Sequence, residues 1–120
     1  MTPITLSKGY FKRGSTWTVQ LTRKDNAGAA VDMTGLTTRA MFRDGSVDGP
    51  VVVTLSDGAG ITIADPTTGV IALSLTATQS ALSTAGSRVY FDIEQTDPVS
   101  GYVWQSPTYR FPVDQEVTRD

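Results

Sequence analysis

The sequence predicts an all-β fold, an antiparallel β-sandwich of about seven to eight short strands with at most one short helical turn. Polar and apolar residues alternate in short segments, which is the pattern of strands with one buried face. Turn-forming Gly, Pro, Asp and Asn residues separate these segments, and no helical period competes with them. A small barrel fits the same signals, but a sandwich is preferred. The 120 residues are expected to form one domain, 1–120, with one core.

Three strands are expected in the first half of the chain, over residues 15–23, 36–43 and 51–55. The inward-facing positions are then Trp17, Val19, Leu21, Thr38, Ala40 and Phe42. Arg39, Met41 and Arg43 alternate with the inward positions of the second strand, and the arginines indicate its solvent-exposed face. The third segment is too short for a helix and rich in β-branched residues.

The middle of the chain predicts a hairpin and one helical turn. Residues 61–63 and 70–75 are separated by the turn sequence 65–69, which favours a hairpin with a five-residue loop. The alternation stops over residues 76–84, where Thr78 is expected to cap a single helical turn that brings Leu82 onto the open end of the core.

The last strands should contain the centre of the sheet. Residues 87–95 alternate most regularly, so this strand is expected to lie centrally and to face Trp17. The final strand, 102–113, contains Pro107, which cannot donate to a ladder and implies an edge position or a bulge. Residues 1–12 are expected to form an N-terminal arm or edge strand, and residues 114–120 a mobile tail.

The composition excludes most catalytic routes. The sequence has no cysteine and no histidine, so disulfides and Ser-His-Asp or Cys-His triads are impossible. Asp92 and Glu94 share one face of a predicted strand and are the candidate carboxylate pair for a hydrolase, but solvated sheet-face charges explain them better. We therefore expect no enzyme activity, no cofactor and no metal, with turn roles for Asp25 and Asp97.

The charges are unevenly distributed along the chain. Residues 1–43 hold seven basic and two acidic residues, a net charge of +5, whereas residues 44–120 hold three basic and ten acidic residues, a net charge of −7. Either strands from both halves interleave and the difference averages out, or complementary faces help copies or partners dock. The total of −2 argues against nucleic-acid binding. There is no bilayer-spanning apolar run and no signal-peptide pattern, so neither a membrane nor export is expected.

Several side chains are candidates for an interface with other proteins. Aromatic residues are favoured interface anchors because they bury a large area with few rotatable bonds. The candidates are Tyr10, Phe11, Arg39, Arg43, Tyr90 and Tyr102. Tyr90 is the strongest of the aromatic residues, because it lies on the outer face of the predicted central strand.

The order of several segments resembles a known family. The segments are 14–19, 25–28, 31–35, 39–43, 70–75, 89–94 and 112–119. Together they resemble small structural proteins of tailed-bacteriophage virions that have an immunoglobulin-like β-sandwich, including the N-terminal domain of upper baseplate or tail adaptor proteins. The resemblance extends from about Gly14 to Arg119.

The resemblance implies a non-enzymatic structural component of a phage virion that docks to neighbouring particle proteins at the tail, baseplate or fibre attachment. Its partners would be other phage structural proteins and copies of itself, with no small-molecule substrate. The chain would be made in the cytoplasm of the bacterial host and located in the virion. A capsid decoration protein on the phage head is the alternative. A carbohydrate-binding module is a further one, motivated by Trp17, Trp104 and several tyrosines, whose aromatic faces can stack on sugars.

Overall fold

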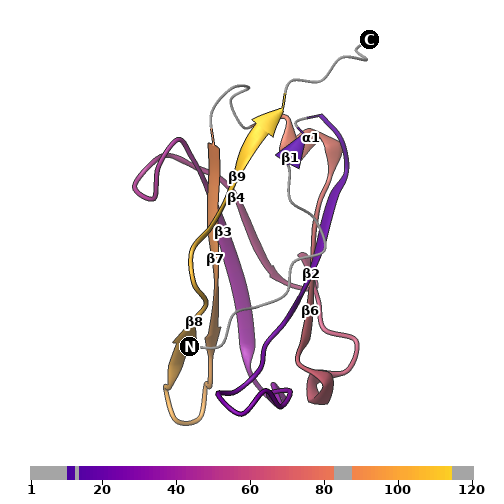
Figure 1. The fold of residues 1–120 in the computed structure, drawn as a ribbon, viewed down its shortest axis with the longest axis vertical. Helices are drawn as coiled ribbons and strands as arrows, with labels where there is room; N and C mark the ends of the chain where they lie inside the picture. The colour runs from indigo at the N-terminus through magenta and orange to yellow at the C-terminus, as the bar shows by residue number, and fades with distance from the viewer. Residues whose placement is uncertain (1–10, 13, 83–87, 115–120) are drawn as a thin grey trace.

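The computed structural model describes residues 11–12, 14–82 and 88–114. The described chain is built almost entirely of short strands, joined by turns (Figure 1). The strands are β1 (Phe11–Lys12), β2 (Trp17–Thr22), β3 (Thr37–Asp44), β4 (Val51–Asp57), β5 (Gly60–Thr62), β6 (Val70–Leu75), β7 (Arg88–Thr96), β8 (Val103–Gln105) and β9 (Tyr109–Asp114). Two helical turns, η1 (Pro66–Thr68) and α1 (Ala77–Ser80), flank β6.

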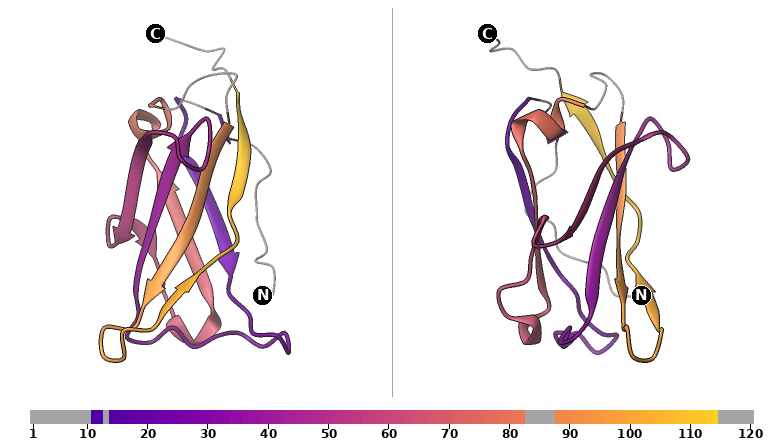
Figure 2. Two further views of the ribbon diagram at one scale, coloured as in Figure 1. Left: turned by 90° about the vertical axis from the view of Figure 1, so that its left-hand side faces the viewer. Right: turned by 180° about the vertical axis from the view of Figure 1, so that it is seen from behind.

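The strands fold into two facing layers, which confirms the all-β sandwich (Figures 1 and 2). The hydrogen-bonded order is β1-β9-β7-β3-β4-β5-β6-β2, with β8 also paired to β7. One layer is formed around β3 and β7, and the other around β6 and β2. The N-terminal part of the chain contacts both layers, because β1 pairs with β9 and β2 pairs with β6. The pairs β1–β9 and β4–β5 are parallel, and the others are antiparallel.

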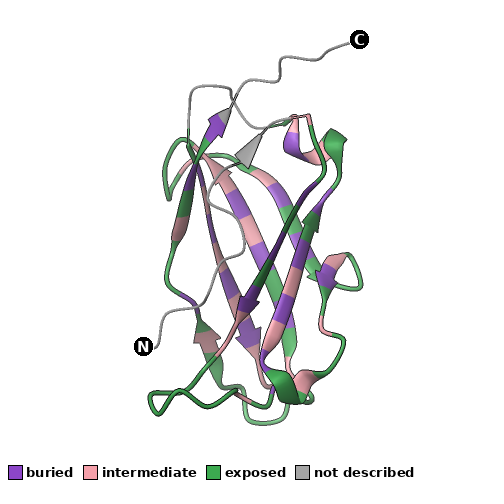
Figure 3. Ribbon diagram, turned by 45° about the vertical axis from the view of Figure 1, so that its right-hand side comes forward, coloured by how far each residue is buried: buried purple, intermediate pink, exposed green. Residues whose placement is uncertain are grey.

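The core lies between the layers and follows the alternation of the sequence. Buried and exposed positions alternate along the strands (Figure 3). Trp17 is 2% exposed and packs edge-on against three phenylalanines, with ring centroids 5.7 Å from Phe42, 5.8 Å from Phe91 and 5.9 Å from Phe111. Such T-shaped contacts are favourable beyond the area that they bury. The expected central strand is confirmed as β7, which lies between β3 and β9 and faces Trp17.

The hairpin and the last strand match their expectations in outline. β5 and β6 pair antiparallel, with Ile61 opposite Leu73, but the connection covers residues 63–69 and contains η1, which the sequence did not predict. Asp65 caps η1 by accepting the Thr67 N–H at 3.0 Å. The expected strand 102–113 is divided into β8 and β9 around Pro107.

The helical turn begins two residues earlier than predicted. Thr76, not Thr78, is its N-cap, because the Thr76 hydroxyl accepts the Gln79 N–H at 3.1 Å while the Gln79 side chain accepts the Thr76 N–H at 2.9 Å. This reciprocal capping box fixes the start of the helix. The expectation that Leu82 covers the core is wrong, since Leu82 is 58% exposed. Ser80 is buried instead, and its hydroxyl donates to the Ser15 carbonyl at 2.7 Å.

The ends of the chain are only partly described. Phe11 and Lys12 form β1, which is the last strand of its layer and pairs with β9. The rest of the expected arm, 1–10, lies outside the described residues, as does 115–120 of the expected tail. Asp114, expected to begin the tail, belongs to β9.

Candidate functional site

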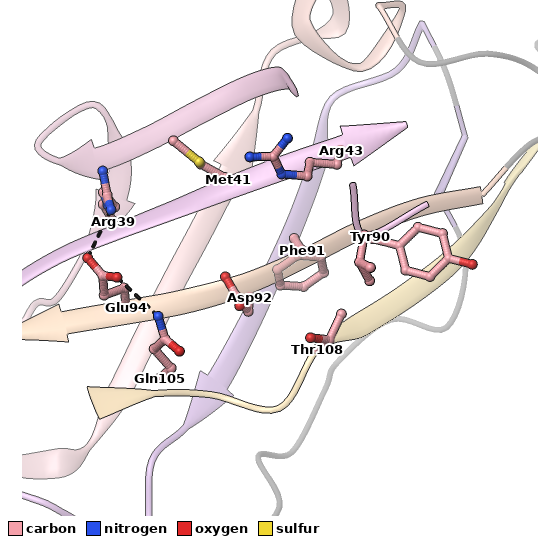
Figure 4. Close-up of a pocket in the computed structure, with 10 residues that line it drawn as sticks. Arg39, Met41, Arg43, Tyr90, Phe91, Asp92, Glu94, Gln105 and Thr108 are labelled. Atoms are coloured by element: carbon pink, nitrogen blue, oxygen red, sulfur yellow. Dashed lines mark hydrogen bonds and ion pairs between the residues drawn. The ribbon is translucent and has the colours of Figure 1, made fainter. Parts of the chain in front are cut away.

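A shallow groove crosses the outer face of the layer that contains β3 and β7 (Figure 4). Its volume is about 240 Å³. We call it the β3–β7 groove, and its lining residues are Arg39, Met41, Arg43, Val47, Tyr90, Phe91, Asp92, Glu94, Gln105 and Thr108. Central strands supply most of these side chains, so the surface has a rigid base.

The groove opens where the final strand is interrupted. β8 pairs with β7 from Glu94 onward and β9 pairs with it up to Phe91, so Asp92 and Ile93 lie opposite the break. Pro107 has no N–H with which to continue the ladder there. Ser106 bridges the break, because its N–H donates to the Ile93 carbonyl at 2.9 Å and its hydroxyl accepts the Ile93 N–H at 2.9 Å. The chain thus stays attached while leaving the surface around Asp92 uncovered by a paired strand.

Basic residues on β3 and acidic residues on β7 form two adjacent rows. The antiparallel register places Arg39 opposite Glu94, Met41 opposite Asp92, and Arg43 opposite Tyr90. The Arg39 guanidinium lies 3.1 Å from the Glu94 carboxylate, and the Gln105 amide donates to the same carboxylate at 3.2 Å (Figure 4). The two arginines and two carboxylates balance in charge.

Arg43 and Asp92 take no part in that ion pair. Arg43 donates to the Gly49 carbonyl at 2.8 Å. No described residue forms a hydrogen bond or salt bridge with the Asp92 carboxylate. Burial, followed by the nearby charge of Glu94, raises the pKa of Asp92, while Arg39 and Arg43 act in the opposite direction.

The structure brings together three of the six predicted interface residues. Arg39, Arg43 and Tyr90 line the groove. Tyr102 is 65% exposed, but it precedes β8 and is absent from the residues that line the groove. Phe11 belongs to β1, and Tyr10 lies outside the described residues.

Gln105 and Thr108 were missed by the sequence reasoning. Both flank the break in the final strand. The sequence analysis treated this segment as one strand with an edge position or a bulge at Pro107. Pro107 was the available signal, because a residue that ends ladder pairing also uncovers the neighbouring strand.

A second polar cluster surrounds Gln95, on the inward face of β7, and is part of the core. Gln95 is 1% exposed, and its amide donates to the Thr38 hydroxyl at 3.1 Å and accepts from Arg23 at 2.7 Å. The Arg23 guanidinium also stacks over the Trp104 ring, 4.0 Å from its centroid. These bonds satisfy a buried amide and cover one face of the indole, so the cluster stabilises the fold.

The turn aspartates have the roles that the sequence predicts. The Asp25 carboxylate accepts the N–H groups of Ala27 and Ala29, and that of Asp97 accepts the Val99 N–H. Hydrogen bonds from Val99 and Ser100 lower the pKa of Asp97. Within the described residues there is no group of three or more potential metal ligands of the His, Cys, Asp or Glu type.

The comparisons with known proteins give a structural likeness of low sequence identity. No family model and no curated protein match this sequence. Among solved structures, the chain is similar to the adhesin domain of Epf from Streptococcus pyogenes, with 18% identity and a TM-score of 0.49. That match covers all of this chain and 35% of the Epf chain, so this chain spans about a third of its length. In the part of the chain that is described, no helix is long and apolar enough to cross a membrane.

Proposed function

We propose that this chain is a non-enzymatic docking module, a structural component of a tailed-phage virion that attaches to neighbouring particle proteins at the tail, baseplate or fibre attachment. A capsid decoration role on the phage head is the alternative. The observation that carries the docking role is the β3–β7 groove, which collects Arg39, Arg43 and Tyr90 on rigid central strands. The phage setting rests on the family resemblance of the sequence.

The chemistry of the groove favours contact over catalysis. Two-carboxylate hydrolysis needs one carboxyl group as acid and a second one free to act as base or nucleophile. Glu94 is occupied by Arg39 and Gln105, which hold both of its oxygens. A sequence without histidine or cysteine also cannot form a Ser-His-Asp or Cys-His triad.

The geometry of the tryptophans disfavours a carbohydrate-binding module. Stacking on a sugar requires an exposed ring face. Trp17 is 2% exposed, inside the sandwich. Trp104 is partly buried and carries Arg23 over one face. Both tryptophans that motivated this alternative are thus used for packing.

The experiment is a rebinding assay on particles of the phage that encodes the chain. Washed wild-type particles should contain the protein at many copies, and particles made without it should recover it when the purified chain is added. Arg43→Glu and Tyr90→Ala should reduce rebinding, whereas Lys24→Glu, at an exposed basic residue that does not line the groove, should not.

Absence of the chain from washed particles overturns the virion role. Equal rebinding of all variants overturns the assignment of the docking surface to the groove. Immunogold electron microscopy of rebound particles then separates the tail from the head.

A further inference from the structure

We propose that the β3–β7 face binds the same face of a second copy of this chain, in a two-fold symmetric dimer whose axis runs parallel to the strands. This inference rests on the proposed function, since it names the partner of the same docking surface. It is carried by the register of β3 and β7, which places unlike side chains at equal heights on the two strands.

A two-fold axis along the strands, midway between β3 and β7, lays β3 of one copy over β7 of the other. Residues at the same height then face each other across the interface. Arg39 faces Glu94 of the second copy, and Arg43 faces Tyr90 of the second copy. The first contact joins opposite charges, and the second places a guanidinium over an aromatic ring. Both contacts occur twice, because a two-fold interface is isologous.

The third pair is Met41 facing Asp92 of the second copy. The groove lies beside Asp92, at the break in the final strand, and provides a hollow of about 240 Å³ for the incoming side chain. Methionine is flexible and fills irregular spaces well. Contact with the thioether adds to the burial that already raises the pKa of Asp92, and Arg39 and Arg43 of the same chain act against that rise.

The charge pattern selects this orientation over the other face-to-face arrangement. A two-fold axis perpendicular to the strands would lay β3 over β3 and place Arg39 near Arg43 of the second copy. Such like-charge contacts are unfavourable and would occur twice. The patch of two arginines and two carboxylates is neutral as a whole, so the patch itself adds no net repulsion to association.

Sedimentation equilibrium of charge-reversed variants tests the proposal. The wild-type chain should dimerise reversibly and more weakly at high salt. Arg39→Glu alone and Glu94→Arg alone should each weaken self-association by at least about tenfold, because symmetry reverses two contacts at once. An equimolar mixture of the two variants should recover association as a heterodimer. In one contact Glu at position 39 then faces Arg at position 94, and in the other the unchanged Arg39 faces the unchanged Glu94, so both contacts join opposite charges.

The mixture separates the dimer contact from the pair within one chain. Each single variant loses its own Arg39–Glu94 ion pair, and mixing does not restore that pair. The double variant Arg39→Glu/Glu94→Arg restores both kinds of contact, so it should dimerise like the wild type even if a single variant folds poorly. Lys24→Glu is the control for a charge change outside the groove and should dimerise normally.

A wild-type chain that stays monomeric at the highest soluble concentration overturns the proposal. So does a mixture that associates no better than the single variants. A monomeric chain that still rebinds particles through the groove would overturn the dimer and retain the docking function. A chain that dimerises in solution but is absent from washed particles would support the dimer and overturn the virion role.

Discussion

Ser106 lies between β8 and β9 and hydrogen-bonds to Ile93 of the central strand β7. Replacing it with alanine should destabilise the fold. Ser106 is 7% exposed, and its hydroxyl accepts the Ile93 N–H at 2.9 Å and donates to the Pro107 carbonyl at 2.9 Å. Its own N–H donates to the Ile93 carbonyl. Ser106→Ala therefore keeps the backbone bond but removes the acceptor of the buried Ile93 N–H and the donor to the Pro107 carbonyl.

The size of the effect follows from that orphaned donor. A buried N–H without an acceptor costs about 1–3 kcal/mol. The free energy of unfolding should fall by this amount, because neither β8 nor β9 pairs with β7 at Ile93 to supply a substitute acceptor. With a denaturant dependence of about 1.5 kcal/mol per molar urea, the unfolding midpoint should fall by roughly 0.7–2 M.

Urea unfolding followed by tryptophan fluorescence measures this loss, since Trp17 is buried in the core. Ser74→Ala is the matched control, because Ser74 is exposed on β6 and the chemical change is identical. Ser106→Thr retains a hydroxyl and should lose less. A Ser106→Ala midpoint equal to that of the wild type, with the Ile93 amide still protected from hydrogen exchange, would refute the reasoning.

Three further changes test other parts of the molecule. Gln95→Leu should lower the free energy of unfolding by about 1–3 kcal/mol in urea titrations, because the partly buried Arg23 loses its acceptor. Gly69 and Gly58 have nearly equal positive φ angles, 74° and 75°. An alanine at either position would therefore cost about 1–2 kcal/mol from backbone strain alone. Gly69→Ala should lower the melting temperature more, because its Cβ would lie 2.5 Å from the Arg23 carbonyl oxygen, whereas the Gly58 Cβ meets nothing within 4 Å. Asp92→Asn should be more stable than the wild type at neutral pH. The raised pKa of Asp92 means that the folded state favours its protonated form, so wild-type stability falls as pH rises from the ordinary pKa of 3.8 through the raised one. The difference should therefore disappear in thermal melts below that ordinary value, and an advantage for Asn that is constant with pH would contradict this explanation.

The strand pattern was predictable because a period of two needs only neighbouring residues. Trp17, Phe42 and Phe91 all lie at the inward positions that the alternation assigns. The same alternation places Gln95 inward, but its side-chain hydrogen-bond partners Thr38, Met33 and Arg23 lie 57, 62 and 72 residues away. Only the strand order brings such distant residues together, and one sequence does not determine that order.

Local signals failed where two residues compete for one role. Thr76 and Thr78 are both good N-cap residues, and Gln79 decides between them because it completes a capping box with Thr76. The groove was predictable only in part. The outer positions Arg39, Arg43 and Tyr90 follow from the strand pattern, but their neighbours across the sheet follow from the pairing of β3 with β7.

The uneven charge along the chain acquires a physical meaning from this pairing. Arg39 and Arg43 close the basic part of the sequence, while Asp92 and Glu94 lie in the acidic part. β3 and β7 are neighbours in the sheet although about fifty residues separate them, so the two parts meet as adjacent rows. Averaging of charge over the whole surface and complementarity between faces are therefore not alternatives. Because β3 and β7 are adjacent, the charges of these four side chains on their outer face sum to zero. The same pairing places a basic row beside an acidic row, and a second copy can present the opposite charges to both rows.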